Sequence, residues 1–395
     1  MAVELEGLAD LPLHEGSVPP WLARIMKRLA KAILEVMVEE FGPNRVVERF
    51  SNPLWFQGFN NVIGMDWDSS GSTTVTTGIL KTVTWSNPHL GLLVLGGKGR
   101  SARKVPEEAP RALELLGVRG LSPNELIKAS RLIAKIDNAM VQDGYTLYHH
   151  ALFVSEDGRW AVVQQGMNTR SRMARRYHWL CTTGFYENPH EAVSGVKHEH
   201  VLNLVDRGSR DTQRVVLDLA RSNPSSVVEE YARAYNAVEK QKSLDYYVAP
   251  TRTGLVGVDY SGKALIYKPL PTPSSLLKKL RRIREVYPHN LDELLLVRGV
   301  DADVLRALAL ISDLVFNEPP STRDPVDTPY DPFIYAYAIG GKDGVPYPVN
   351  RRVAEEVIYT LEDFVERAKL GDKEKLRALK SLSRIKFRVL GKYLG

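Results

Sequence analysis

The stretch YTLYHHALFVSEDGRWAVVQQGM, residues 145–167, predicts a β-hairpin. Two runs rich in aromatic and β-branched residues flank a Ser-Glu-Asp-Gly turn at 155–158. Successive strand residues point to opposite sides of a sheet, so His149 and His150 are expected on different faces. The hairpin places a β-sheet in the N-terminal part of the chain, which we expect to be an α+β or α/β domain.

The segments before this hairpin alternate between expected helices and expected strands. Apolar residues spaced by three and four predict a helix over 18–50. Residues 106–140 return to helix in two stretches, the second with Ser122 as its N-cap and Pro123 in its first turn. The threonine-rich run at 69–85 is typical of a strand. A short apolar strand then leads into Gly96-Gly97-Lys98-Gly99, a turn whose backbone amides can surround an anion.

The chain has 395 residues, which is enough for two or three domains. The proline-rich joint at 269–275 is the best boundary, and the segments after it are mainly helical in pattern. We therefore expect an α/β domain over 1–268, an all-α domain over 269–370 and a basic C-terminal tail over 371–395.

The stretch LDELLLVRGVDADVLRALALISDLV, residues 291–315, resembles the helix–hairpin–helix found in many DNA repair proteins. In that motif the hairpin lets backbone amides approach a phosphate without reading the bases. The resemblance assigns phosphate contact to Arg298, Gly299 and Val300. Asp301 stands where the motif usually has its second glycine.

Positive charge is concentrated at the C-terminus. The net charge is +6, and residues 371–395 hold eight basic and two acidic residues, so the remaining chain is neutral. Two further basic runs lie at 170–179 and 278–285. Such clusters favour contact with a polyanion, and we expect double-stranded DNA as the partner. The basic residues assigned to this contact, besides Arg298, are Arg175, Arg176, Lys278, Lys279, Arg384 and Lys386.

Several motifs together resemble the domain of unknown function 763 family of archaea and bacteria. They include LPLHEGSVPPWL (11–22), GMDWDSSGSTTVTTGILK (64–81), GGKGRSARKVPEE (96–108) and ASRLIAKIDNAMVQDGYTLYHHALF (129–153). The resemblance implies one architecture but no activity. Glu15, Asp68 and Asn350 depart from the family pattern as we expect it, in which glycine, histidine and aspartate stand at these positions.

Acidic residues in these motifs predict a divalent-metal site. Asp66, Asp137 and Asp143 are the candidate carboxylates, and Mg²⁺ or Mn²⁺ is the expected ion, held by Asp137 and Asp143. Lys98 and Lys104 would neutralise a bound phosphate, and His149 or His178 would act as acid or base. This arrangement is typical of an enzyme that hydrolyses phosphodiester bonds.

Three other functions fit the same residues. A lesion-base DNA glycosylase would receive an extruded base in an aromatic pocket. Its essential aspartate is replaced here by Asn350, with Asp327 as a conceivable substitute, and Asp303 stands where the lyase-type enzymes have a lysine. A non-catalytic DNA-binding protein and a small-molecule enzyme with an anion loop are the remaining alternatives.

The composition limits the class of protein. Cys181 is the single cysteine, so the chain forms no internal disulfide and no cysteine-built metal site. No apolar run reaches the roughly 18–20 residues of a membrane helix, and the expected location is the cytoplasm. The abundance of Lys, Arg and Glu is compatible with a thermophilic source. The oligomeric state does not follow from the sequence.

Overall fold

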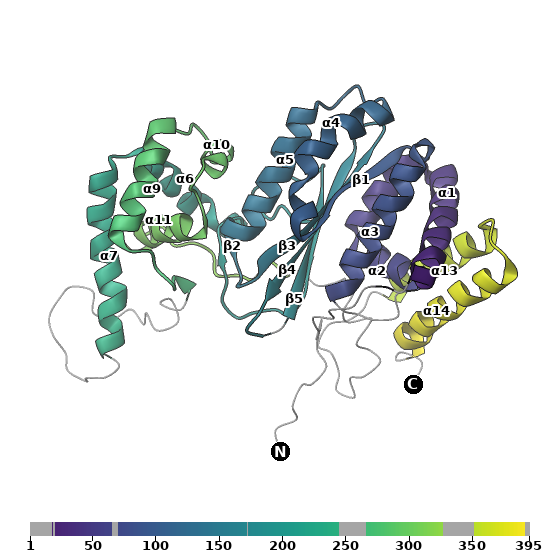
Figure 1. Cartoon of the computed structure of the whole chain (residues 1–395). Coiled ribbons are helices and arrows are strands. Elements are labelled where there is room, and N and C mark those ends of the chain that lie inside the picture. Colours follow the sequence, from purple (N-terminus) through teal and green to yellow (C-terminus); the bar gives the residue numbers. More distant parts are fainter. Residues whose placement is uncertain are drawn as a thin grey trace, which may run out of the picture.

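The computed structural model has a β-sheet with helices on both faces, a separate group of helices beside it and a C-terminal helix pair (Figure 1). This is a mixed α+β architecture. The residues that the structure describes are 18, 20–64, 70–171, 173–244, 266–326 and 351–391.

The central sheet has five antiparallel strands. The predicted hairpin is confirmed as β3 (Thr146–Ser155) and β4 (Trp160–Asn168). On one side β1 (Leu92–Lys98) pairs with β3, and on the other β5 (Met173–Leu180) pairs with β4 and β6 (Ala192–Ser194). The strand order is therefore β1-β3-β4-β5-β6.

Both faces of the sheet are buried because helices cover them (Figure 1). We call one the α5 face, since α4 (Val105–Leu116) and α5 (Pro123–Lys135) lie on it. We call the other the α3 face, since α1 (Pro20–Ser51), α2 (Pro53–Val62) and α3 (Ser70–Ser86) lie on that side. Alternation along the strands divides the core accordingly: Leu152 and Val162 belong to one apolar cluster, and Phe153 and Val163 to the other.

The threonine-rich run is a helix, so the strand predicted at 69–85 is wrong. In α3, Ile79, Leu80 and Val83 are buried at helical spacing against the sheet. Thr77 donates from Oγ1 to the carbonyl of Thr73 at 2.8 Å, which satisfies its hydroxyl within the helix. Burial of one face of the segment thus outweighs its local preference for extended backbone.

A body of helices lies beside the sheet. Its members are α6 (Arg210–Arg221), α7 (Pro224–Leu244), α9 (Pro273–Val286), α10 (Leu291–Leu296) and α11 (Ala302–Leu314). We call this group the helical body. Residues 304–313 of α11 are all buried, so this helix forms the centre. The helical body includes residues 210–244, which the sequence placed with the first domain.

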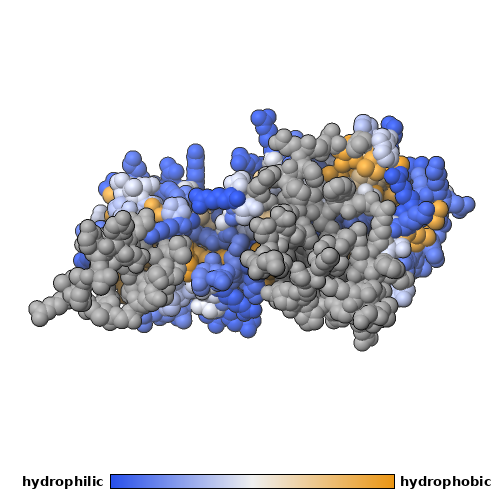
Figure 2. All heavy atoms as spheres, turned by 90° about the horizontal axis from the view of Figure 1, so that it is seen from below, coloured by the Kyte–Doolittle hydropathy of each residue, from blue (hydrophilic) through white to orange (hydrophobic). Residues whose placement is uncertain are grey.

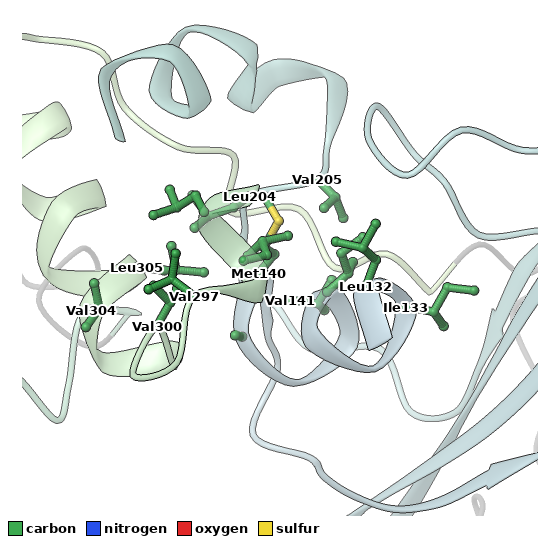
Figure 3. Close-up of a cluster of buried hydrophobic side chains, with 14 of the residues drawn as sticks. Leu132, Ile133, Met140, Val141, Leu204, Val205, Val297, Val300, Val304 and Leu305 are labelled. Carbon is green, nitrogen blue, oxygen red and sulfur yellow. The ribbon is translucent and has the colours of Figure 1, made fainter. Parts of the chain in front are cut away.

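One apolar core joins the helical body to the sheet. A short ribbon of β2 (Val141–Gln142) and β7 (Leu202–Asn203) lies at the junction. Figure 3 shows side chains from α5 and this ribbon facing those of the segment around α11. All the labelled residues belong to one buried cluster: Leu132, Ile133, Met140, Val141, Leu204, Val205, Val297, Val300, Val304 and Leu305.

The C-terminal helices return to the first part of the chain. Helices α13 (Arg351–Arg367) and α14 (Asp372–Gly391) pack on each other and on α2. Phe364 lies against Trp55, with ring centroids 6.0 Å apart. The basic C-terminal segment is thus a helix that contributes Ala378 and Leu382 to the core. In the view from below, hydrophilic residues cover most of the coloured surface (Figure 2).

Across the described ranges, no helix combines the length and the apolar character needed to cross a membrane.

Candidate functional site

In the turn between α10 and α11, Gly299 is half-buried and the Val300 amide donates to the Val297 carbonyl at 3.2 Å. Gly299 has a φ of 105°, a conformation that favours glycine because other side chains strain there. Val300 beside it is fully buried and anchors the turn in the core. Asp301 begins α11, and its side chain accepts from the amide of Val304 at 3.1 Å.

Basic side chains surround this turn. The Arg282 guanidinium reaches within 3.8 Å of the position that a Cβ on Gly299 would occupy. Lys278, Arg282 and Arg298 are exposed and have no ion-pair partner within the described part of the chain. Lys279 instead pairs with Asp301, at 2.6 Å from Nζ to Oδ2. That pair compensates the charge of Asp301.

A second open site lies at the end of β1, where Gly96 and Gly97 have φ values of 79° and 135°. A Cβ on Gly96 would lie 2.2 Å from the carbonyl oxygen of His150, so the close strand pairing requires glycine. Glu108 accepts from the Gly96 amide at 2.8 Å, and Lys81 donates to the Gly96 carbonyl at 2.7 Å. Lys81 and Glu108 also bond each other, so both charges are used in fixing the turn.

The turn borders a cavity of about 290 Å³ on the α3 face. Its polar lining comes from the glycine turn and from α3: Thr74, Thr77, Lys81, Gly97, Lys98 and Ser101. Lys98 therefore lies where the sequence predicted an anion. Lys104 is exposed at the end of the same loop and does not line the cavity.

His149 lies behind this cavity, with Nε2 3.1 Å from Oγ1 of Thr77. Burial lowers the pKa of His149 to about 3, and the positive charges of Arg176 and Lys98 act in the same direction. Burial also lowers the pKa of His178 well below its usual value. Both imidazoles are neutral at pH 7, and a base as weak as His149 is a poor proton acceptor there.

Asp137 lies on the opposite face of the sheet. The Oδ1 atom is 2.5 Å from Nε2 of His190. Its Oδ2 accepts from Nε2 of Gln164 at 2.5 Å and from the Trp179 indole at 2.8 Å. The carboxylate is fully buried, and its oxygens are bonded to three side chains.

Asp143 takes part in a buried ion pair. Arg175 donates from Nη1 to Asp143 at 2.8 Å and from Nη2 to Asp324 at 2.8 Å, and all three side chains are inaccessible or nearly so. The Tyr177 hydroxyl donates to Asp143 at 2.6 Å. Asp143, Tyr177 and Asp324 raise the pKa of Arg175 against the effect of burial, which keeps the guanidinium charged.

The structure separates the residues that the sequence grouped into a metal site. Asp137 and Asp143 are on the α5 face, whereas Lys98 and His149 are neighbours on β1 and β3 and belong to the α3 face. Among the residues of the described ranges, no group of three or more His, Cys, Asp or Glu side chains is placed to hold a metal ion. The predicted pair of metal ligands is engaged in internal hydrogen bonds and ion pairs.

Burial also removes two arginines from the predicted DNA surface. Arg175 and Arg176 are fully buried, because β5 is an inner strand on which Arg175 faces Asp143 and Asp324 and Arg176 faces α3. Arg176 donates from Nε to Oγ1 of Thr73 at 2.9 Å. Asp66 lies outside the described residues, as do the side chains of Arg384 and Lys386.

Sequence reasoning missed His190 and Asp324, which complete the two buried networks. Both lie in irregular segments with no motif or periodicity around them. Their partners are distant in the chain: 53 positions separate His190 from Asp137, and 149 separate Asp324 from Arg175. No local signal in the sequence identifies such pairs.

The fold and these sites define an α+β protein with two glycine turns flanked by exposed basic side chains, one on the helical body and one on the sheet. A model of the family described as "Protein of unknown function (DUF763)" matches residues 7–349, and the chain belongs to that family. The predicted family membership is thereby confirmed. No curated protein and no solved structure shows significant similarity to the chain.

Proposed function

We propose that this protein binds double-stranded DNA through the backbone phosphates, without reading the base sequence. The observation that carries the proposal is the turn at Gly299 with the Arg282 guanidinium beside it. Exposed Lys278 and Arg298 extend the positive charge around the turn. A glycine turn of this kind is where a helix–hairpin–helix would contact phosphate, and the buried Val300 anchors the turn.

The physical basis is electrostatic and sequence-independent. A glycine turn allows a phosphate close to the main chain, and the exposed basic side chains around the turn supply the positive charge. Arginines that neutralise phosphates release counterions from DNA, which favours binding at low salt. Because no base edge is required, the affinity for duplexes of different sequence should be similar.

Binding without hydrolysis is the form of this function that the geometry supports best. Asp137 and Asp143, the carboxylates expected to hold Mg²⁺ or Mn²⁺, are occupied by side chains of the α5 face. Phosphodiester hydrolysis and base excision stay predictions from sequence. Release of shortened strands or of a free base from DNA would establish either activity.

Fluorescence anisotropy with a labelled duplex tests the binding. The full-length protein should bind, and its affinity should fall steeply as salt is added. Arg282→Ala and Arg298→Ala should each weaken binding and reduce the slope of log K against log salt by about one. Arg119→Ala, which removes an exposed arginine from the sheet body, is the matched control.

Two results would contradict the proposal. One is absence of binding in low-salt buffer. The other is that Arg282→Ala and Arg298→Ala both bind the duplex as strongly, and with the same salt dependence, as the control Arg119→Ala.

A further inference from the structure

The cavity at the end of β1 is separate from the turn at Gly299 in the helical body, and different residues line it. It holds about 290 Å³ and lies between the glycine turn and helix α3. This volume is at the low end of the range for small-molecule sites. It suits one compact group, whereas a duplex backbone continues in both directions and needs an open surface.

The wall formed by the turn is fixed before any ligand arrives. The Lys81–Glu108 pair bonds both the amide and the carbonyl of Gly96. Ordering this turn therefore costs no conformational entropy on binding, which favours affinity. The same bonds neutralise Lys81, so its charge is not the one that recognises a ligand.

Lys98 is the cation that remains for a ligand. It lines the cavity and has no ion-pair partner in the part of the chain that the structure describes. The loop 98–104 contains four basic residues and no acid. The cavity mouth thus has a positive potential that attracts a multiply charged anion.

The hydroxyl groups that line the cavity differ in whether they are free to hydrogen-bond a ligand. Thr74 and Thr77 donate to the carbonyls of Gly71 and Thr73, at 3.0 and 2.8 Å. Ser101 makes no side-chain hydrogen bond with a described residue, so its hydroxyl is available to a ligand. Neutral His149 behind Thr77 adds no charge to this wall. Among the described residues of the lining, Lys98 and Ser101 are therefore the side chains with donors available to a ligand.

We propose that this cavity binds a phosphate monoester group through Lys98 and Ser101. A dianionic terminal phosphate matches a compact cavity, a lysine, a hydroxyl and a loop that contains only basic charges. Two sources share this chemistry: a small phosphorylated molecule and the terminal phosphate of a nucleic acid. The inference does not depend on the hairpin, because its residues belong to the sheet body.

Calorimetric titration of the full-length protein tests the site, with inorganic phosphate and ribose 5-phosphate as probes. We expect saturable binding of ribose 5-phosphate. Lys98→Ala should weaken it by about tenfold or more, as expected for loss of a charge-assisted hydrogen bond. Ser101→Ala should weaken it less, and Lys104→Ala, which removes the same charge outside the lining, should change it by less than about threefold.

A parallel anisotropy experiment separates the two sources, using duplexes that end in a phosphate or in a hydroxyl. One outcome is that the duplex with the phosphorylated end binds more tightly than the duplex with the hydroxyl end. If Lys98→Ala abolishes this difference in affinity and Arg282→Ala preserves it, the site is assigned to nucleic acid ends. Equal binding of the two duplexes, with saturable ribose 5-phosphate binding, assigns it to a small molecule. Absence of saturation by ribose 5-phosphate and by the phosphorylated end, or equal losses in Lys98→Ala and Lys104→Ala, overturns the proposal.

Discussion

The two faces of the central sheet differ in the groups that surround their buried ionisable side chains. On the α5 face, Arg175 is paired with two carboxylates and Asp137 is bonded to three side chains. On the α3 face, buried Arg176 donates to the hydroxyl of Thr73, a neutral group. The buried histidines His149 and His178 on this face are neutral because burial lowers their pKa. The α5 face satisfies its charges internally, while the α3 face leads to an open cavity at the end of β1.

This difference distinguishes polar residues that stabilise the fold from polar residues that can bind a ligand. Buried ion pairs tie distant segments together, as Arg175 ties β5 to the segment that contains Asp324. Such residues are not accessible to a ligand, whichever amino acids they are. A ligand site instead needs polar groups whose bonds are incomplete and reachable, and Lys98 and Ser101 meet both conditions.

The largest expected effect comes from breaking the paired face. Arg175→Met should lower the free energy of unfolding by about 3–5 kcal/mol, because it leaves Asp143 and Asp324 as buried carboxylates without their cation. Chemical denaturation at neutral pH measures the loss. Arg170→Met, an exposed arginine before the same strand, is the control. Equal stability of the two variants would contradict the role given to the buried pair.

A smaller effect is expected from acid, through the buried histidines. The pKa of His149 is about 3 in the folded protein and near 6.5 when the chain is unfolded. The unfolded chain therefore binds more protons below pH 6.5, and stability falls as the pH falls. The loss is on the order of 1.4 kcal/mol per pH unit for each such histidine. His150 and His178, whose pKa values burial also lowers, add to it.

Denaturation curves between about pH 7 and pH 5 measure this dependence. His149→Gln should reduce the proton uptake on unfolding by about one. The exposed His89→Gln is the control and should keep the wild-type slope. A slope that is unchanged by His149→Gln would show that this imidazole is not buried in a neutral form.

Part of the architecture could be predicted from local pattern. The β3–β4 hairpin follows from alternation around a turn, and α5 from Ser122 and Glu125, which form a capping box. Helix α3 could not be predicted, because its threonines favour strands and only packing against the sheet decides otherwise. The lesson is that local propensity fails where tertiary burial is strongest.

The candidate sites were predictable to different degrees. The glycine turn with Lys98 and the hairpin with Gly299 lie within single short segments, so the sequence locates them. Arg175 and Arg176 resembled a surface patch, since adjacent basic residues rarely lie inside a fold. Their burial depends on partners far along the chain, such as Asp324 and Thr73, which no local pattern reveals.

Amide hydrogen exchange of the full-length protein, with and without a saturating DNA duplex, locates the surface that contacts DNA. We expect the duplex to slow exchange in the segment 278–304, which contains most of α9 and the turn at Gly299. Segments of the buried α5 face should change little. Protection confined to parts of the chain outside 278–304, or no protection at all, would contradict the proposed DNA contact.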